Sequence, residues 1–160
     1  MKNKSDLDLK FLQNDSAKNH TFGIVRALWN EEITQRLYDG CYNKLLEYGA
    51  HNKNILTLEV PGSFELIYGG KKIIKQTKKL DAVILIGSII KGETPHFDFI
   101  SQAIANGVKD LNILFDTPFV FCVLTDLNWN QSINRSGGKM GNKGEDSALA
   151  AMSLIKNCTY

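Results

Sequence analysis

The chain has 160 residues, of which 43% are hydrophobic and 22% are charged, and its formal net charge is +2. This apolar content excludes a disordered chain, and no stretch approaches the about 20 consecutive apolar residues of a membrane-spanning helix. A nucleic-acid-binding protein would gather more basic residues on one face, so neither nucleic acid nor a membrane is expected as a partner.

Residues 1–20 are polar and mixed in charge, and they lack the apolar core of a signal peptide. We therefore predict a polar tail at residues 1–20, a single domain over residues 21–160 and a cytoplasmic location. Beyond the tail, short β-branched runs alternate with longer segments of helical periodicity. This alternation is typical of a parallel sheet covered by helices.

Four strands are predicted, at residues 21–27, 55–60, 81–87 and 119–124. Helices are predicted at about residues 30–49, 63–79, 95–115, 128–135 and 143–157. The fold class is α/β, a flavodoxin-like three-layer sandwich whose four-stranded parallel sheet is flanked by helices on both faces. In open α/β sheets, ligands bind beyond the carboxyl ends of the strands. The four strand-to-helix turns are therefore the candidate sites.

The first turn contains Trp29 and Asn30. Trp29 offers a flat face to a planar ligand, although it could equally pack over the end of the sheet. Asn30 is a good N-cap for the first helix, and Glu31 and Glu32 favour the positive end of its dipole. Gly49 is predicted to end this helix in the left-handed conformation.

The second turn places an acid directly after an aromatic residue, in the sequence Val60-Pro61-Gly62-Ser63-Phe64-Glu65. Glu65 could accept hydrogen bonds from the hydroxyls of a sugar-like chain, although glutamates are also common in a first helical turn for dipole reasons. The helix that follows carries lysines at helical spacing, which favours a solvated face over a nucleic-acid site. These lysines are Lys71, Lys72, Lys75, Lys78 and Lys79.

The third turn is predicted to run from Ser88 to Thr94 and to lead into a helix through Pro95. Thr94 is a natural N-cap, and free amides at a helix N-terminus beside Gly92 can hold an anion. The glycine spacing is that of a P-loop, but Glu93 stands where the lysine is required, so no Walker A motif exists. An ordinary capped helix explains the same residues.

His96 lies one residue past Pro95, in the first helical turn. The helix dipole disfavours the imidazolium cation there, which leaves a neutral ring able to exchange protons near neutral pH. A hydrogen-bonded surface histidine is the alternative when the residue is considered by itself. His20 and His51 lie in polar segments and carry no predicted role.

Arg135 ends a short helix before a glycine-rich link, and Lys139 and Lys143 follow it. A guanidinium can bind phosphate bidentately, whereas lysines act as point charges. Basic residues at helix ends also occur for dipole reasons alone.

The cysteines are Cys41, Cys122 and Cys158, which are widely spaced and form no CxxC pair. This spacing predicts neither a disulfide framework nor a zinc site. Cys122 is expected to be a small core residue, because it lies in an apolar run.

Three longer motifs follow Trp29-Asn30 in order. They are Val60-Pro61-Gly62-Ser63-Phe64-Glu65, Gly92-Glu93-Thr94-Pro95-His96-Phe97-Asp98 and Arg135-Ser136-Gly137-Gly138-Lys139-Met140-Gly141-Asn142-Lys143-Gly144. Together these motifs closely resemble the lumazine synthase family, the 6,7-dimethyl-8-ribityllumazine synthases of riboflavin biosynthesis. The likeness spans roughly Phe22 to Ile155. One such motif is moderately specific, whereas four in the same order and spacing are strongly so.

The resemblance implies a reaction of 5-amino-6-(D-ribitylamino)uracil with 3,4-dihydroxy-2-butanone 4-phosphate. The products would be 6,7-dimethyl-8-ribityllumazine, phosphate and water, in the penultimate step of riboflavin biosynthesis. His96 aligns with the family's proton-transfer histidine. Every step is a proton transfer, so no metal and no cofactor is expected.

The resemblance also implies roles for the residues around both substrates. Trp29 would stack on the pyrimidine, residues 63–65 would hold the ribityl chain, and residues 88–90 would line the uracil by main chain. The full set expected around the ribitylaminouracil is Trp29, Asn30, Ser63, Phe64, Glu65, Ser88, Ile89, Ile90, Phe121 and Lys143. The set expected around the butanone phosphate is Gly92, Glu93, Thr94 and Arg135.

Homo-pentamers are also implied, with twelve pentamers in a hollow icosahedral shell, and riboflavin synthase is a candidate associated enzyme. Phe121 and Arg135 would reach the site from the neighbouring subunit, so the site would be complete only at a subunit interface. The chain departs from the family pattern at three places: Lys91 stands where arginine is usual, Cys122 replaces a glycine, and Trp129-Asn130 replaces a more acidic pair. None of these departures removes a named role.

Two other functions compete with this one. A non-catalytic lumazine- or flavin-binding shell or carrier would bind ligand without turnover, but it would need neither His96 nor the phosphate-binding charges of Arg135 and Lys143. A flavodoxin-like FMN-binding or signalling module would need a Ser/Thr-rich phosphate loop in the first turn. The chain has Arg26-Ala27-Leu28-Trp29-Asn30 there.

Overall fold

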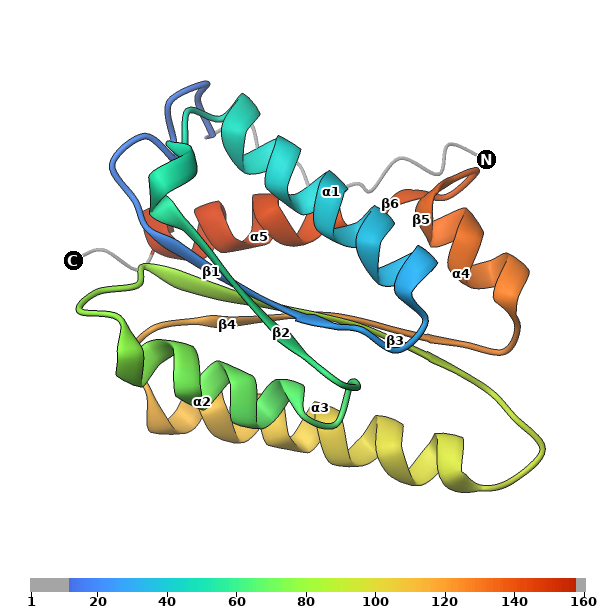
Figure 1. The fold of residues 1–160 in the computed structure, drawn as a ribbon. Helices are drawn as coiled ribbons and strands as arrows, with labels where there is room; N and C mark the ends of the chain where they lie inside the picture. Colours follow the sequence, from blue (N-terminus) through green and yellow to red (C-terminus); the bar gives the residue numbers. More distant parts are fainter. Residues whose placement is uncertain (1–11, 158–160) are drawn as a thin grey trace.

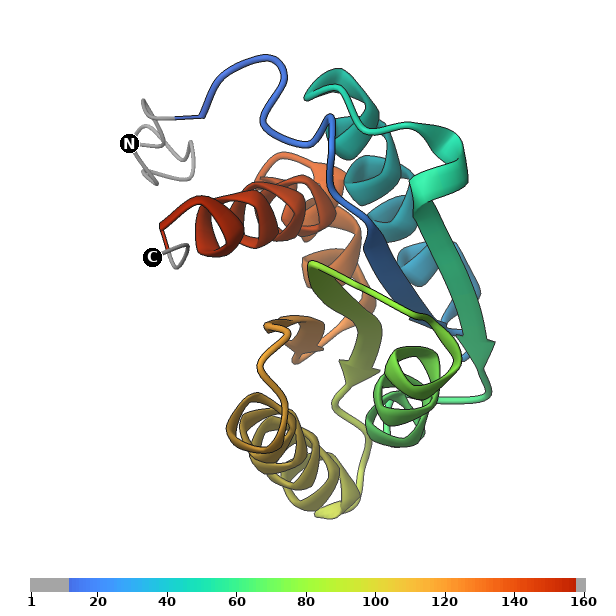
Figure 2. The ribbon, with the colours of Figure 1, turned by 90° about the vertical axis from the view of Figure 1, so that its left-hand side faces the viewer.

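One parallel sheet organises the protein, whose structure is a computed structural model that describes residues 12–157. The sheet order is β2-β1-β3-β4, and its strands are β1 (Phe22–Ala27), β2 (Ile55–Val60), β3 (Ala82–Ile90) and β4 (Phe119–Asp126). The long helices are α1 (Glu31–Glu47), α2 (Leu66–Gln76), α3 (His96–Leu114) and α5 (Lys143–Asn157). Helices α1 and α5 cover one face, and α2 and α3 cover the other (Figure 1, Figure 2). The predicted three-layer α/β sandwich is confirmed.

Several short elements complete the described part of the chain. A 3-10 turn, η1 (Asn52–Asn54), precedes β2, and helix α4 (Trp129–Arg135) follows β4. The glycine-rich link before α5 forms an antiparallel hairpin of β5 (Ser136–Gly138) and β6 (Gly141–Asn142). No strand was predicted in this link. No helix within residues 12–157 is long and apolar enough to cross a membrane.

The core lies on both faces of the sheet. Because successive side chains of a strand point to opposite faces, Ile84 and Ile86 of β3 pack toward α1 and α5, whereas Val83 and Leu85 pack toward α2 and α3. β1 is buried along its whole length, but the edge strand β2 alternates between buried and exposed positions. This pattern explains why the central strands are continuous apolar runs. The five lysines of residues 71–79 are exposed, as predicted.

Strands β3 and β4 extend further than the sequence suggested. β3 was predicted to end at Gly87, but its pairing with β4 continues from Gly87 opposite Val123 to Ile90 opposite Asp126. Gly87 and Ser88 look like a strand end because glycine and serine are weak strand formers, and the partner strand overrides that preference. These two strands therefore project beyond the ends of β1 and β2. Helix α2 begins at Leu66 rather than at residue 63.

Both ends of α1 were predicted from the sequence. Asn30 occupies the N-cap position in a left-handed conformation, with φ 58°, and its side chain makes no capping hydrogen bond. The predicted N-cap position of Asn30 is confirmed, but the side-chain hydrogen bond that is usual at this position is not made. Gly49, with φ 92°, follows the helix in the left-handed region, where glycine avoids the steric clash of a β-carbon.

Part of the segment predicted as a polar tail packs on the domain. Ala17 is fully buried, and its amide donates to the Tyr48 carbonyl at 2.9 Å. His20 Nδ1 lies 3.6 Å from Asp81 Oδ2, so His20 has a charged neighbour that the sequence did not indicate. Residues 1–11 of the predicted tail and Cys158 lie outside the described residues.

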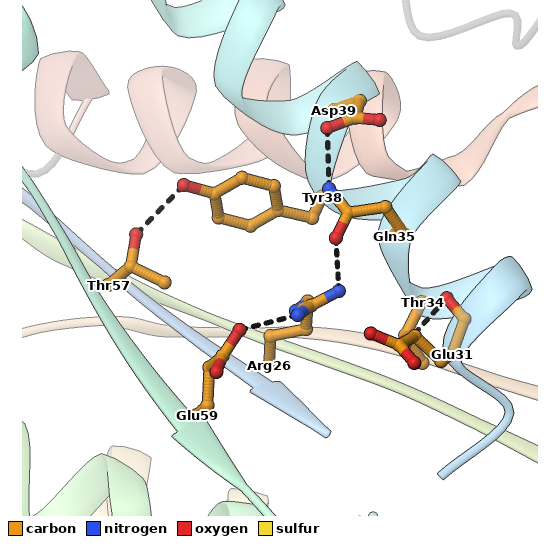
Figure 3. Close-up of polar contacts among 8 residues, drawn as sticks. All are labelled: Arg26, Glu31, Thr34, Gln35, Tyr38, Asp39, Thr57 and Glu59. Carbon is orange, nitrogen blue, oxygen red and sulfur yellow. Dashed lines mark hydrogen bonds and ion pairs between the residues drawn. The ribbon is translucent and has the colours of Figure 1, made fainter. Parts of the chain in front are cut away.

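A buried arginine ties the first turn to its neighbours, as Figure 3 shows. Arg26 of β1 donates to Gln35 of α1 and forms an ion pair with Glu59 on β2. The Tyr38 hydroxyl lies 3.0 Å from Thr57 Oγ1, which joins α1 directly to β2. A buried cation is tolerated when it is paired and hydrogen-bonded in this way. The cluster fixes α1 against the sheet just before Trp29.

Candidate active site

Two hollows border the sheet, one at the carboxyl ends of β1, β2 and β3 and the other along the edge strand β4. The first, which we call the β1–β3 crevice, has a volume of about 520 Å³. Its lining comprises Trp29, Asn30, Gly62, Ser63, Phe64, Glu65, Ser88, Ile89, Ile90, His96 and Ile100. Nine of the residues predicted around the substrates are therefore brought together from the ends of three strands and the starts of two helices.

The second hollow, the β4–α5 crevice, has a volume of about 660 Å³. It is lined by Val120, Phe121, Cys122, Val123, Leu124, Thr125, Asp126, Arg135, Lys143, Asp146, Ser147, Leu149 and Ala150. The three other predicted site residues with a crevice position, Phe121, Arg135 and Lys143, all lie here. The two crevices share no lining residue, so one chain divides the predicted site into two parts.

The aromatic face of the β1–β3 crevice is held by the backbone below it. The amide of Trp29 donates to the Pro61 carbonyl at 2.9 Å, which ties the end of β1 to the turn after β2. The side chain itself is 73% exposed. Trp29 does not cover the end of the sheet as a core residue, and its ring is free to contact a planar ligand.

Asn30 links the first turn to the third. Its Nδ2 donates to the Ser88 carbonyl at 3.0 Å, across 58 residues of sequence. The left-handed backbone directs the amide toward β3 instead of toward the start of α1. Because Ser88 is followed by Ile89 and Ile90 in the crevice wall, Asn30 fixes the main chain that the sequence analysis assigned to uracil contact.

Two buried hydroxyls in this crevice have no partner within residues 12–157. Ser63 Oγ and Ser88 Oγ are both inaccessible and make no hydrogen bond. A β-carbon on Gly87 would lie 2.6 Å from Ser63 Oγ, so only glycine allows this close approach. Buried polar groups are nearly always satisfied, so these two hydroxyls beneath the crevice wall are exceptions to that rule.

His96 and the turn before it face solvent. His96 is the first residue of α3 and lines the β1–β3 crevice together with Ile100, one turn later. Gly92, Glu93 and Thr94 are exposed and line neither crevice. Thr94 is not the N-cap that was predicted, because Pro95 occupies that position and no side chain caps the helix. The first amides of α3 therefore have no side-chain acceptor.

The charged residues of the β4–α5 crevice are paired within the protomer. Arg135 Nη1 lies 3.4 Å from Asp126 Oδ1, and Lys143 Nζ lies 2.7 Å from Asp146 Oδ2. Beside them, Phe121 is 42% exposed. A half-exposed aromatic ring and two oriented cations can bind a flat, anionic molecule.

Cys122 is buried in the wall of this crevice, as predicted for a core cysteine. Burial raises the pKa of its thiol to about 12. The pKa of Cys41 is also raised, by burial and by the nearby Cys122. Both thiols therefore stay protonated and unreactive at neutral pH. Within residues 12–157, no three His, Cys, Asp or Glu side chains gather as a metal site.

Sequence reasoning missed two acids of the β4–α5 crevice. Asp126 stands at the carboxyl end of β4 and Asp146 stands in the first turn of α5. Asp126 could have been found as an acid two residues beyond an apolar strand. It was not considered, because the strand was predicted to end at Leu124. Asp146 resembled an ordinary dipole-favoured acid.

Comparison with known proteins agrees with these features. The family profile described as 6,7-dimethyl-8-ribityllumazine synthase matches residues 19–159. A 6,7-dimethyl-8-ribityllumazine synthase of Flavobacterium psychrophilum is 52% identical over 96% of this chain and 79% of the relative. The protein of the same name from Christiangramia forsetii is 49% identical over 96% of this chain and 90% of its own length. That from Porphyromonas gingivalis is 40% identical, covering 95% and 92% of the two chains.

Proposed function

The chain belongs to the 6,7-dimethyl-8-ribityllumazine synthase family and has its activity in riboflavin biosynthesis, and we propose that its two crevices each supply part of the site that binds the two substrates. The activity condenses 5-amino-6-(D-ribitylamino)uracil with 3,4-dihydroxy-2-butanone 4-phosphate. The observation that carries the proposal is the separation of the site groups into two hollows with no lining residue in common.

The β1–β3 crevice binds the ribitylaminouracil. Trp29 stacks on the pyrimidine, since its ring is exposed and its backbone is held by Pro61. The Glu65 carboxylate and the backbone of Ser63 and Phe64 bind the ribityl hydroxyls. The main chain of residues 88–90, fixed through Asn30, pairs with the polar edge of the uracil.

The phosphate group binds at the start of α3. Gly92, Glu93 and Thr94 form the turn, where free backbone amides and the positive end of the helix dipole favour an anion. Glu93 contributes through its backbone, because a carboxylate side chain would repel the phosphate. Arg135 adds a guanidinium that can bind phosphate oxygens in two places.

His96 transfers protons between the two substrates. An amine condenses with a ketone, phosphate leaves, and the ring closes with loss of water, so each step moves a proton. His96 lies in the same crevice as Trp29 and directly after the phosphate-binding turn. Holding two reactants in line can lower a barrier by about 7–11 kcal/mol, and a positioned acid–base group adds ~100- to 10,000-fold in rate.

A complete site requires two subunits. Phe121, Arg135 and Lys143 lie in the β4–α5 crevice of their own chain, away from Trp29 and His96. In a ring of identical subunits, the β4–α5 crevice of one chain meets the β1–β3 crevice of the next, which is a heterologous interface that closes on itself. We therefore propose a homo-pentamer, with twelve pentamers in a shell and riboflavin synthase as an associated enzyme.

The proposal is tested by combining both substrates with the purified protein. Turnover appears as the absorbance and fluorescence of 6,7-dimethyl-8-ribityllumazine, and phosphate is released in equal amount. A carrier would change the fluorescence on binding but would release no phosphate. Analytical ultracentrifugation measures the assembly in the same preparation. A fully active monomer would contradict the shared site.

A further inference from the structure

A buried carboxylate stands behind Arg135. Asp126 is the last residue of β4, and its side chain is 6% exposed. Its Oδ2 accepts a hydrogen bond from Ser132 Oγ at 2.8 Å, and its Oδ1 lies 3.4 Å from Arg135 Nη1. Ser132 is itself fully buried. The carboxylate thus contacts two residues of α4 that are three positions apart and share one face of that helix.

Such a carboxylate is costly to bury without charged or hydrogen-bonding partners. Ser132 supplies one neutral hydrogen bond, and Arg135 supplies the ion pair that the structure gives this carboxylate within residues 12–157. Asp126 is also fixed through its backbone, because its carbonyl accepts from the Lys91 amide at 2.9 Å. The anchor of Arg135 is therefore rigid.

The contact with Arg135 leaves most of the guanidinium free. One amino group faces Asp126, while the side chain is 38% exposed in the crevice that also holds Phe121 and Lys143. A guanidinium has five N–H donors, so a single contact leaves a pair of donors for phosphate. A carboxylate gripping both amino groups would compete with phosphate instead.

We propose that Asp126 is a positioning residue that holds the Arg135 guanidinium ready to bind the phosphate of the butanone substrate. This inference rests on the proposed role of Arg135. Asp126 acts through Arg135 and touches no substrate. An arginine already held in one orientation loses less side-chain freedom on binding than a mobile one, so the phosphate is bound more tightly.

The test variant removes the charge of Asp126 and keeps the shape of its side chain. Asp126→Asn retains an oxygen that can accept from Ser132 but removes the negative charge that holds Arg135. We expect the KM for 3,4-dihydroxy-2-butanone 4-phosphate and the inhibition constant of inorganic phosphate to rise by about five- to tenfold. The KM for the ribitylaminouracil stays unchanged. The exposed Asp110→Asn, on α3, is the matched control and changes none of these constants.

A double-mutant cycle separates positioning from a purely structural role. In an Arg135→Ala background, Asp126→Asn should raise neither constant further, because the residue that it positions is gone. Ser132→Ala is the second variant, which keeps the charge and removes one hydrogen bond. It should raise the phosphate inhibition constant by about two- to threefold.

Three results would overturn the inference. A phosphate constant unchanged or lowered in Asp126→Asn, while Arg135→Ala raises it, would show that Asp126 does not position Arg135. Equal increases in both KM values, or an additive effect in the Arg135→Ala background, would assign Asp126 a merely structural role. If Arg135→Ala itself left the phosphate constant unchanged, the role proposed for Arg135 would fail first, and the inference would fall with it.

Discussion

The two crevices differ in how their functional groups are held. In the β1–β3 crevice the Trp29 ring is 73% exposed, and the inaccessible hydroxyls of Ser63 and Ser88 have no partner in the described chain. In the β4–α5 crevice, Arg135 and Lys143 already form ion pairs with acids of their own chain. One crevice therefore offers an open aromatic ring, and the other offers oriented charge.

This difference agrees with the proposed roles of the two crevices in substrate binding. The exposed ring and the fixed backbone groups of the β1–β3 crevice fit the proposed binding of a flat, neutral heterocycle. The oriented guanidinium of Arg135 fits the proposed binding of phosphate, because charge-assisted hydrogen bonds depend on geometry. The carbonyl of one substrate and the amine of the other must meet where the two crevices join. We expect His96 to transfer protons at that point.

The largest effect is expected from His96→Ala. Removal of the proton-transfer group should lower kcat by ~100-fold or more, with detectable activity left from substrate alignment. Steady-state kinetics of lumazine formation measure it. His51→Ala, which changes an exposed histidine before β2, is the control. Complete loss of activity with intact assembly would show that alignment contributes less than stated here.

Arg135→Ala should act on binding. A bound phosphate that loses a charge-assisted partner costs ~1.5–3 kcal/mol, so the KM for the butanone phosphate should rise by about ten- to a hundredfold. The KM of Arg135→Lys should lie between those of the wild type and Arg135→Ala, because lysine keeps the charge and loses the forked geometry. Arg36→Ala, at an exposed helix pair, is the control. An unchanged KM would remove Arg135 from the phosphate site.

Trp29→Ala tests the β1–β3 crevice in the same way. Loss of the stacking ring should weaken binding of the ribitylaminouracil by about tenfold and leave the KM for the butanone phosphate unchanged. Isothermal titration calorimetry measures the affinity of the wild-type protein and of Trp29→Ala. Equal affinity with and without Trp29 would exclude it from the site.

The smallest effect concerns the cysteine in the wall of the β4–α5 crevice. Because burial raises the pKa of Cys122 to about 12, the thiolate fraction at pH 8 is about a thousandfold below that of a thiol with pKa 9.0. A thiol reagent should leave activity unchanged at pH 8 in a Cys158→Ser background. The rate at which the reagent modifies Cys122 should rise about tenfold per pH unit above pH 9. A plateau near pH 9 would contradict the raised pKa.

Much of the fold could be predicted because it depends on local pattern. β2 and α5 have the predicted bounds, and the apolar positions of α1, from Ile33 to Leu45, are buried as their spacing indicates. The extra length of β3 could not be predicted, since it depends on pairing with β4 and not on the strand propensity of Gly87 and Ser88.

In the candidate site, too, features set by local sequence could be predicted, and contacts between distant residues could not. The turn residues stand at strand ends in sequence, so their gathering in the β1–β3 crevice followed from topology. The contacts of Asn30 with Ser88 and of Arg26 with Glu59 join residues 58 and 33 positions apart, and periodicity carries no information about such pairs. The buried contact of Asp126 with Ser132 was likewise invisible, because the strand was predicted to end before it.

The most direct test of the shared site is complementation between two variants. His96→Ala damages the β1–β3 crevice and Arg135→Ala damages the β4–α5 crevice. If each site combines crevices of neighbouring subunits, an equal co-assembly should recover about a quarter of wild-type activity at low butanone phosphate, because about one site in four has both crevices intact. If the co-assembly shows only the average of the two parental activities, each site lies within a single chain and the shared site is refuted.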